Sequence, residues 1–115
     1  MSDLFAFKIL TREQWERFRA EGVFTGAPID VADGYIHLSA RDQVTETVTK
    51  HFAGQDNLIL AMVDLVALGE AVKWEPSRGG ALFPHVYGSL PLGAVTTTAK
   101  IRLGPDGKHV FPAGF

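Results

Sequence analysis

The stretch GGALFPHVYG, residues 79–88, carries two side chains that can do chemistry, the imidazole of His85 and the phenol of Tyr87. Two positions apart in an extended chain, they point to the same side. One interpretation is that the pair completes a ligand pocket. The other is that apolar neighbours plug one end of a sheet while the imidazole and hydroxyl bond to nearby backbone. The residues alone leave both open.

The preceding segment, WEPSRGG, adds three side chains of chemical interest. Glu75 can stabilise positive charge or activate a hydroxyl. Arg78, followed by two glycines, can clamp a phosphate or carboxylate, and Trp74 offers a stacking surface. A solvated loop with a local ion pair explains the same residues, so what favours a site is their concentration just before His85.

A second candidate group lies in YIHLS, residues 35–39. In a strand, Tyr35, His37 and Ser39 share one side. His37 is either a core histidine bonded to backbone or a pocket residue that contacts a ribose hydroxyl or carbonyl. Ser39 is expected to cap the following helix, and a capped helix N-terminus beside His37 would favour an anion.

Several other chemistries are excluded or not predicted. The chain has no cysteine, so disulfides, thiol nucleophiles and cysteine zinc sites are excluded. Its four histidines lack metal-ligand spacing, and no metal site is predicted. No Ser-His-Asp elbow, P-loop or dinucleotide-binding glycine pattern is found.

Composition predicts an ordinary globular protein with one domain, residues 1–115. The net charge of −2 does not indicate nucleic-acid binding, although a local basic pocket stays possible. No apolar run approaches the roughly 20 residues of a membrane span, and the start lacks the basic region of a signal peptide. We therefore expect a cytoplasmic protein without membrane contact.

The elements that would position these residues mix strands and helices, which favours an α+β fold. A capping box at TREQ predicts a helix over 11–21, and a second helix follows Ser39. The nearly all-apolar run 58–65 predicts a central strand covered on both faces, and a helical turn is expected over 65–70. Other predicted strands are 4–10, 35–39, 72–74, 95–103 and 109–111. Loops are expected over 26–34 and 77–94.

Five motifs together resemble a family of small, mostly bacterial proteins known as domain-of-unknown-function family nine-five-two. They lie at 34–39, 51–52, 56–64, 74–75 and 83–88. The resemblance covers essentially the whole chain. It identifies a family, but it implies no activity by itself.

That family is similar in fold to the ADP-ribosyltransferase-like superfamily. The order of YIHLS, a helix to KHF, LILAMVD and VKWE resembles the RNA 2′-phosphotransferases, which use NAD. This similarity implies two small, curved, mostly antiparallel sheets in a split barrel, with two main flanking helices. Tyr35 stands where those enzymes have a histidine, and only His37 matches. Their arginine set lacks clear counterparts. The superfamily also includes toxins that hydrolyse NAD or transfer from it, and Glu75 cannot be equated with their catalytic glutamate.

We therefore predict a pocket between the sheets that binds a nucleotide-like ligand, NAD or ADP-ribose, with ADP-ribosyl or phosphate transfer as the possible reaction. The predicted catalytic residues are Glu75, His85 and His37, and the predicted ligand-binding residues are Tyr35, Ser39, Trp74, Arg78 and Tyr87. No cofactor is required, and NAD would be a substrate. Whether the protein is an enzyme, a transferase or glycohydrolase acting on NAD, stays open. The alternatives are a non-catalytic interaction module and a small-metabolite hydrolase or isomerase that uses a His/Glu acid-base pair.

Overall fold

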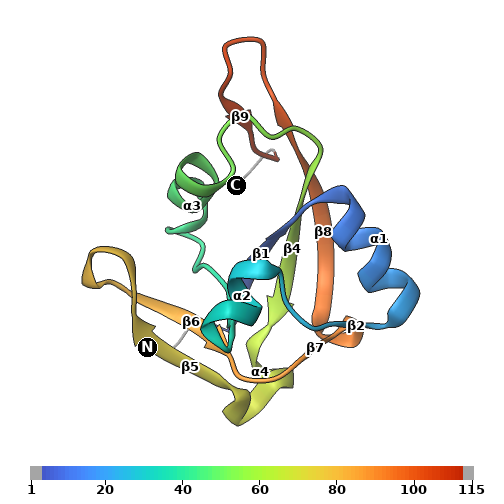
Figure 1. The fold of residues 1–115 in the computed structure, drawn as a ribbon, viewed down its shortest axis with the longest axis vertical. Coiled ribbons are helices and arrows are strands. Elements are labelled where there is room, and N and C mark those ends of the chain that lie inside the picture. The colour runs from blue at the N-terminus through green and yellow to red at the C-terminus, as the bar shows by residue number, and fades with distance from the viewer. Residues whose placement is uncertain (1–3, 113–115) are drawn as a thin grey trace.

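Strand β4 (Leu58–Asp64) lies at the centre of the main sheet, as its nearly all-apolar sequence predicts. The computed structural model describes residues 4–112, apart from the side chain of Arg78, as curled antiparallel sheets that form a half-barrel (Figure 1). In the main sheet β4 pairs with β1 (Phe5–Leu10) and with β8 (Val95–Leu103), and β9 (His109–Val110) follows at the edge. The predicted α+β class is confirmed.

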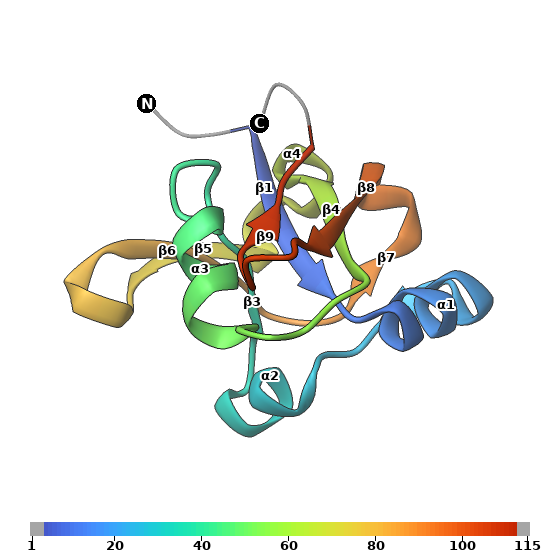
Figure 2. The same cartoon turned by 90° about the horizontal axis from the view of Figure 1, so that it is seen from above.

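The main sheet is buried on both faces because alternate residues of β4 enter two different cores. Ile59, Ala61 and Val63 join a core with Phe18 of the first helix, α1 (Arg12–Glu21). On the other face, Leu58 and Leu60 pack with Val44 and Val48 of α3 (Val44–His51). In both views β1 and β4 lie between α1 and α3 (Figures 1 and 2), which are the two longest helices of the described chain.

Helix α1 begins and ends as its sequence predicts. Thr11 and Gln14 form the expected capping box, with bonds of 3.1 and 2.9 Å between side chain and backbone. Gly22 ends the helix at φ +76°, a left-handed conformation that glycine adopts without a steric penalty. The chain then forms β2 (Val23–Phe24), which pairs with β7 (Leu90–Pro91).

The predicted loop over 26–34 is wrong, because it contains helix α2 (Pro28–Asp33). Proline suits the first turn of a helix, since it has no N–H to leave unsatisfied there. Asp30 bonds back to the Ala27 N–H at 2.8 Å, and Gly34 ends the helix at φ +88°. Figure 2 shows α2 at the edge of the molecule, leading back into the sheets at β3 (Ile36–His37).

Ser39 is not the cap of the following helix, so that prediction is wrong. α3 begins at Val44, after a turn in which the Gln43 side chain accepts from the Ala40 N–H at 2.9 Å. Ser39 instead forms a two-bond bridge with Phe7 of β1. This bridge links the main sheet to the sheet that carries the histidines.

The predicted loop over 77–94 is also wrong in its centre, where β6 (Leu82–Val86) lies between β3 and β5 (Val72–Pro76). Pro84 would normally argue against a central strand. Its carbonyl accepts from Leu38 N at 3.0 Å, and the second bond of this pair would need the N–H that proline lacks. The N–H that Pro84 lacks would therefore have bonded at the end of the ladder between β6 and β3. The hydrogen bonds between β6 and β5 do not use it.

The short helix α4 (Leu65–Leu68) confirms the helical turn predicted after β4. Asp64 caps it by accepting from Val66 N at 2.9 Å. None of the helices within residues 4–112 is long and apolar enough to span a membrane.

Candidate functional site

The sheet β3–β6–β5 has two chemically different faces. Ile36, Val72 and Val86 point into the core together with Trp74. The opposite face carries a group that we call the polar face, defined as Tyr35, His37, Glu75, His85 and Tyr87. His37 and His85 are direct partners across β3 and β6, so their side chains share that face.

Through one oxygen, Glu75 joins His85 of β6 to Tyr87, which follows the end of that strand. Its Oε1 lies 2.8 Å from Nδ1 of His85 and accepts a hydrogen bond of 2.8 Å from the Tyr87 hydroxyl. The His85 side chain is 1% exposed, whereas that of Glu75 is 36% exposed. The three groups therefore connect a buried imidazole to the protein surface.

The hydrogen bonds of Glu75 shift the pKa values of Glu75 and Tyr87. The pKa of Glu75 lies below its ordinary value, first because His85 bonds to it and then because Tyr87 does. The pKa of Tyr87 is raised, mainly because its hydroxyl donates to Glu75. At neutral pH Glu75 is thus a carboxylate beside a neutral phenol.

The second nitrogen of His85 has no hydrogen-bond partner among the described residues. Because a carboxylate can only accept, Nδ1 carries a proton in the contact with Glu75. In a neutral ring Nε2 then holds a lone pair, yet it is buried and no hydrogen-bond partner for it lies within the described chain. An unsatisfied buried polar atom is costly and calls for an explanation. A role in chemistry or ligand binding supplies one.

Aromatic rings surround this imidazole, with Tyr35 at the centre. The Tyr35 ring stacks on His85 with centroids 4.1 Å apart and an interplanar angle of 23°. It also lies 4.8 Å from the ring of His37 and 5.3 Å from that of Tyr87. The polar face is therefore a cluster of rings with one carboxylate at its edge.

His37 lies between two carboxylates. Its Nδ1 is 2.7 Å from Asp30 Oδ1, and its Nε2 is 3.0 Å from Asp33 Oδ2. The contact with Asp30 is a hydrogen bond in which Nδ1 donates, because an ionised carboxylate can only accept. The His37 ring also lies edge-on to that of His85, with centroids 5.4 Å apart and an interplanar angle of 74°.

Asp30 anchors this region from inside the protein. It is 2% exposed and accepts from Lys8 Nζ at 3.0 and 3.2 Å, from the N–H groups of Ala27 and His37, and from the His37 ring. Burial alone would raise the Asp30 pKa, but His37, Lys8 and the two N–H groups together lower it to about 2. Burial lowers the pKa of Lys8 more than Asp30 raises it. The carboxylate is therefore the better-stabilised partner of the pair.

We expect Asp30 to make stability depend on acid pH. Because its pKa falls from 3.8 to about 2 on folding, its contribution is complete above pH 4 and is lost as the pH falls towards 2. Lys8 stays protonated throughout this range. The loss should be about 2 kcal/mol, at 1.36 kcal/mol per pKa unit. Urea unfolding of the wild type and of Asp30→Asn at pH 4 and pH 2 measures it, and equal losses in both proteins would contradict the assignment.

A cleft of about 540 Å³ opens beside His37, between α2 and α3. This volume suits a small ligand. Its apolar wall includes Phe7, Ile9 and Phe52, and its polar lining includes Lys8, Asp30, Asp33, His37, Ser39 and Thr47. His37 thus belongs both to the cleft and to the polar face.

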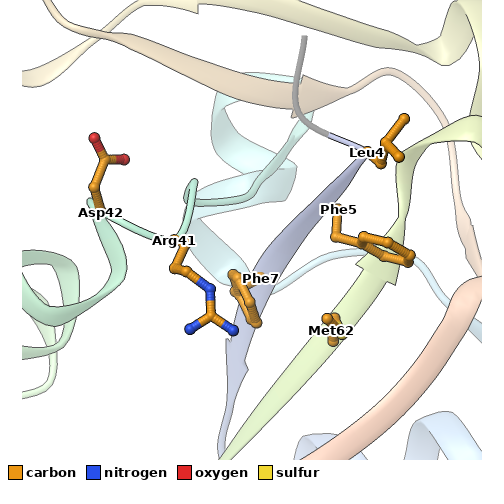
Figure 3. Close-up of a pocket in the computed structure, with 6 residues that line it drawn as sticks. All are labelled: Leu4, Phe5, Phe7, Arg41, Asp42 and Met62. Carbon is orange, nitrogen blue, oxygen red and sulfur yellow. The ribbon is translucent and has the colours of Figure 1, made fainter. Parts of the chain in front are cut away.

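A second cleft, of about 550 Å³, lies on the main sheet and holds none of the predicted site residues. Figure 3 shows it between Phe5 and Met62 on one side and Asp42 on the other, with the Arg41 guanidinium beside the Phe7 ring. The distance from Arg41 to the Phe7 ring centroid is 5.7 Å. The described residues that line it are mainly apolar and include no acid-base pair.

The structure brings together five of the eight predicted site residues, the members of the polar face. Ser39 lines the neighbouring cleft, where its hydroxyl lies 2.8 Å from that of Thr47. Trp74 does not join the group, because it packs against the core on the other side of β5. The Arg78 side chain lies outside the described residues. The roles assigned to all eight stay predictions.

Sequence reasoning missed Lys8, Asp30 and Asp33. One signal was available, because a lone lysine inside the apolar strand FAFKIL needs a buried carboxylate partner. The sequence does not say which of its acidic residues that partner is. In the part of the chain that the structure describes, no group of three or more histidine and acidic side chains could hold a metal ion.

Known proteins resemble this chain closely in sequence and fold. The X-ray structure of CC0527 from Caulobacter crescentus has a TM-score of 0.87 at 48% identity, over 92% of this chain and 93% of that one. Its solution NMR structure has a TM-score of 0.82 at 48% identity, over 92% and 91%. No curated protein matches. The model of a family described as "protein of unknown function (DUF952)" matches residues 9–98. The chain therefore belongs to the DUF952 family.

Proposed function

We propose that the polar face binds a nucleotide-like small molecule, NAD or ADP-ribose, and that Glu75 and His85 act on it. The observation that carries the proposal is the 2.8 Å contact between Glu75 Oε1 and His85 Nδ1, with the opposite Nε2 buried and unpartnered among the described residues. Such a carboxylate-oriented imidazole is suited to general base catalysis. The fold similarity implied by the sequence motifs is what suggests NAD.

Each residue has a role in this proposal. The ring of Tyr87 offers a stacking surface for a base or nicotinamide, and Tyr35, stacked on His85 in this structure, borders the same site. The phosphates are assigned to Arg78. Lys8 is not available to bind them, because its three N–H groups already donate to Asp30 and to the His37 carbonyl. His37 would contact the ribose.

In the proposed transfer, the bond from ribose C1′ to the nicotinamide nitrogen breaks, and nicotinamide leaves with the electron pair. An acceptor hydroxyl forms the new bond to C1′ and gives its proton to Nε2 of His85. Glu75 stabilises the positive charge that develops on the ribose. With water as the acceptor, the same steps give hydrolysis to ADP-ribose.

A ligand screen by thermal unfolding tests binding. NAD, ADP-ribose, nucleotides and sugar phosphates are compared, because a ligand at a hundred times its dissociation constant stabilises by roughly 2.7 kcal/mol. We expect NAD or ADP-ribose to raise the melting temperature of the wild type and not that of Tyr87→Ala. No shift with any of them would contradict nucleotide binding.

The same pair favours a second candidate, acid-base catalysis on a small metabolite. Glu75 and His85 need no nucleotide to transfer a proton, and the neighbouring cleft is lined by two carboxylates and three hydroxyls. A melting-temperature shift with sugar phosphates alone would favour this candidate over NAD.

A further inference from the structure

The Nε2 atom of His85 is buried, although the proposed chemistry needs it to meet a ligand. The ring stacked on His85 is that of Tyr35, at 4.1 Å. Its other near neighbours are the rings of His37 and Tyr87. Tyr35 therefore lies in a seat formed by these three residues, and its ring covers one face of the His85 imidazole.

The two ends of Tyr35 are held very differently. Its backbone N–H donates to the Asp30 carbonyl at 3.2 Å, and the N–H of His37 donates to Asp30 Oδ1 at 3.1 Å. Its hydroxyl, by contrast, makes no hydrogen bond within the described chain, so only ring contacts hold the half-buried phenol. Aromatic contacts of this kind are individually weak. The ring can leave by rotation about its side-chain bonds while the backbone stays in place.

We propose that Tyr35 is an internal plug, whose ring fills a seat for a ligand ring between His37, His85 and Tyr87 and swings out when that ligand binds. This inference rests on the proposed function, because the seat adjoins the Glu75–His85 pair. It also names the ligand chemistry, a flat aromatic ring of about the size of a phenol that stacks on an imidazole. A ligand without such a ring would leave the plug closed.

Chemical modification of His85 tests the plug without any natural ligand. Diethyl pyrocarbonate acylates accessible neutral imidazole nitrogens, and peptide mass spectrometry separates His85 from the exposed His51. In the wild type we expect slow modification of His85 beside rapid modification of His51. In Tyr35→Ala, modification of His85 should accelerate at least about tenfold, with His51 unchanged. Tyr35→Phe keeps the ring and should keep the protection.

A small phenol added to Tyr35→Ala distinguishes a plug from a general loss of stability. Adding 4-methylphenol, the side chain of tyrosine as a free molecule, to Tyr35→Ala should restore the slow modification of His85. A variant that is merely less stable would show no such rescue. Failure of the rescue, or equal reactivity of His85 and His51 in the wild type, would overturn the plug. Nucleotide binding is measured separately, so its failure would leave this result standing.

Discussion

Replacing Asp30 with asparagine should destabilise the protein by about 3–5 kcal/mol, because the substitution leaves buried Lys8 without its counter-charge. The asparagine oxygen can still accept from Ala27, so the start of α2 should survive. Urea unfolding at pH 7 measures the loss as a lower midpoint with an unchanged slope. A loss below about 1 kcal/mol would show that the Lys8–Asp30 pair does not anchor the site.

Two further variants isolate the cause. Asp33→Asn also removes a carboxylate that contacts His37, but its side chain is 41% exposed, so its cost should stay below about 1 kcal/mol. Combining Lys8→Met with Asp30→Asn removes both buried charges and should recover most of the loss. If the double variant is as unstable as Asp30→Asn alone, the damage does not come from the unpaired lysine.

In the proposed reaction, replacing Glu75 with glutamine should lower the turnover of NAD about 10²–10⁴-fold, the range typical of a lost acid-base or charge-stabilising group. The amide keeps the shape of the side chain but removes the charge that orients His85 Nδ1–H and stabilises the ribosyl group. Nicotinamide release measures the rate, and the melting temperature checks the fold.

The matched control for Glu75 is Glu70→Gln, which changes an exposed glutamate just before β5. Its turnover should equal that of the wild type. Wild-type turnover by Glu75→Gln would show that the carboxylate has no part in the reaction, even if the ligand still binds.

The sequence correctly predicts the helices and strands whose local residue pattern matches the way they are buried in the fold. Strand β4 is apolar on both faces and lies at the centre, and α1 carries its own capping box and terminal glycine. The alternation in YIHLS correctly separates Ile36 and Leu38, which are buried, from Tyr35 and His37. These predictions need no knowledge of distant contacts.

The predictions that fail depend on what distant residues do. Pro84 is acceptable in a central strand only because the β3 ladder ends opposite it, which no local pattern shows. Helix α2 is held by Asp30, whose partner Lys8 lies 22 residues away. Trp74 and Glu75 are neighbours, so strand alternation could have shown that they face opposite sides. The predicted strand stops at Trp74, whereas β5 continues to Pro76, so the predicted alternation does not extend to Glu75.

The measurement that tests the central claim most directly is an NMR titration of the wild-type protein with NAD and with ADP-ribose. If the polar face is the ligand site, the ring signals of Tyr35, His37, His85 and Tyr87 should shift together and saturate at one dissociation constant. The signals of Phe5, in the cleft on the main sheet, should stay in place. Unchanged ring signals at millimolar ligand, or shifts confined to the main-sheet cleft, would contradict the proposed site.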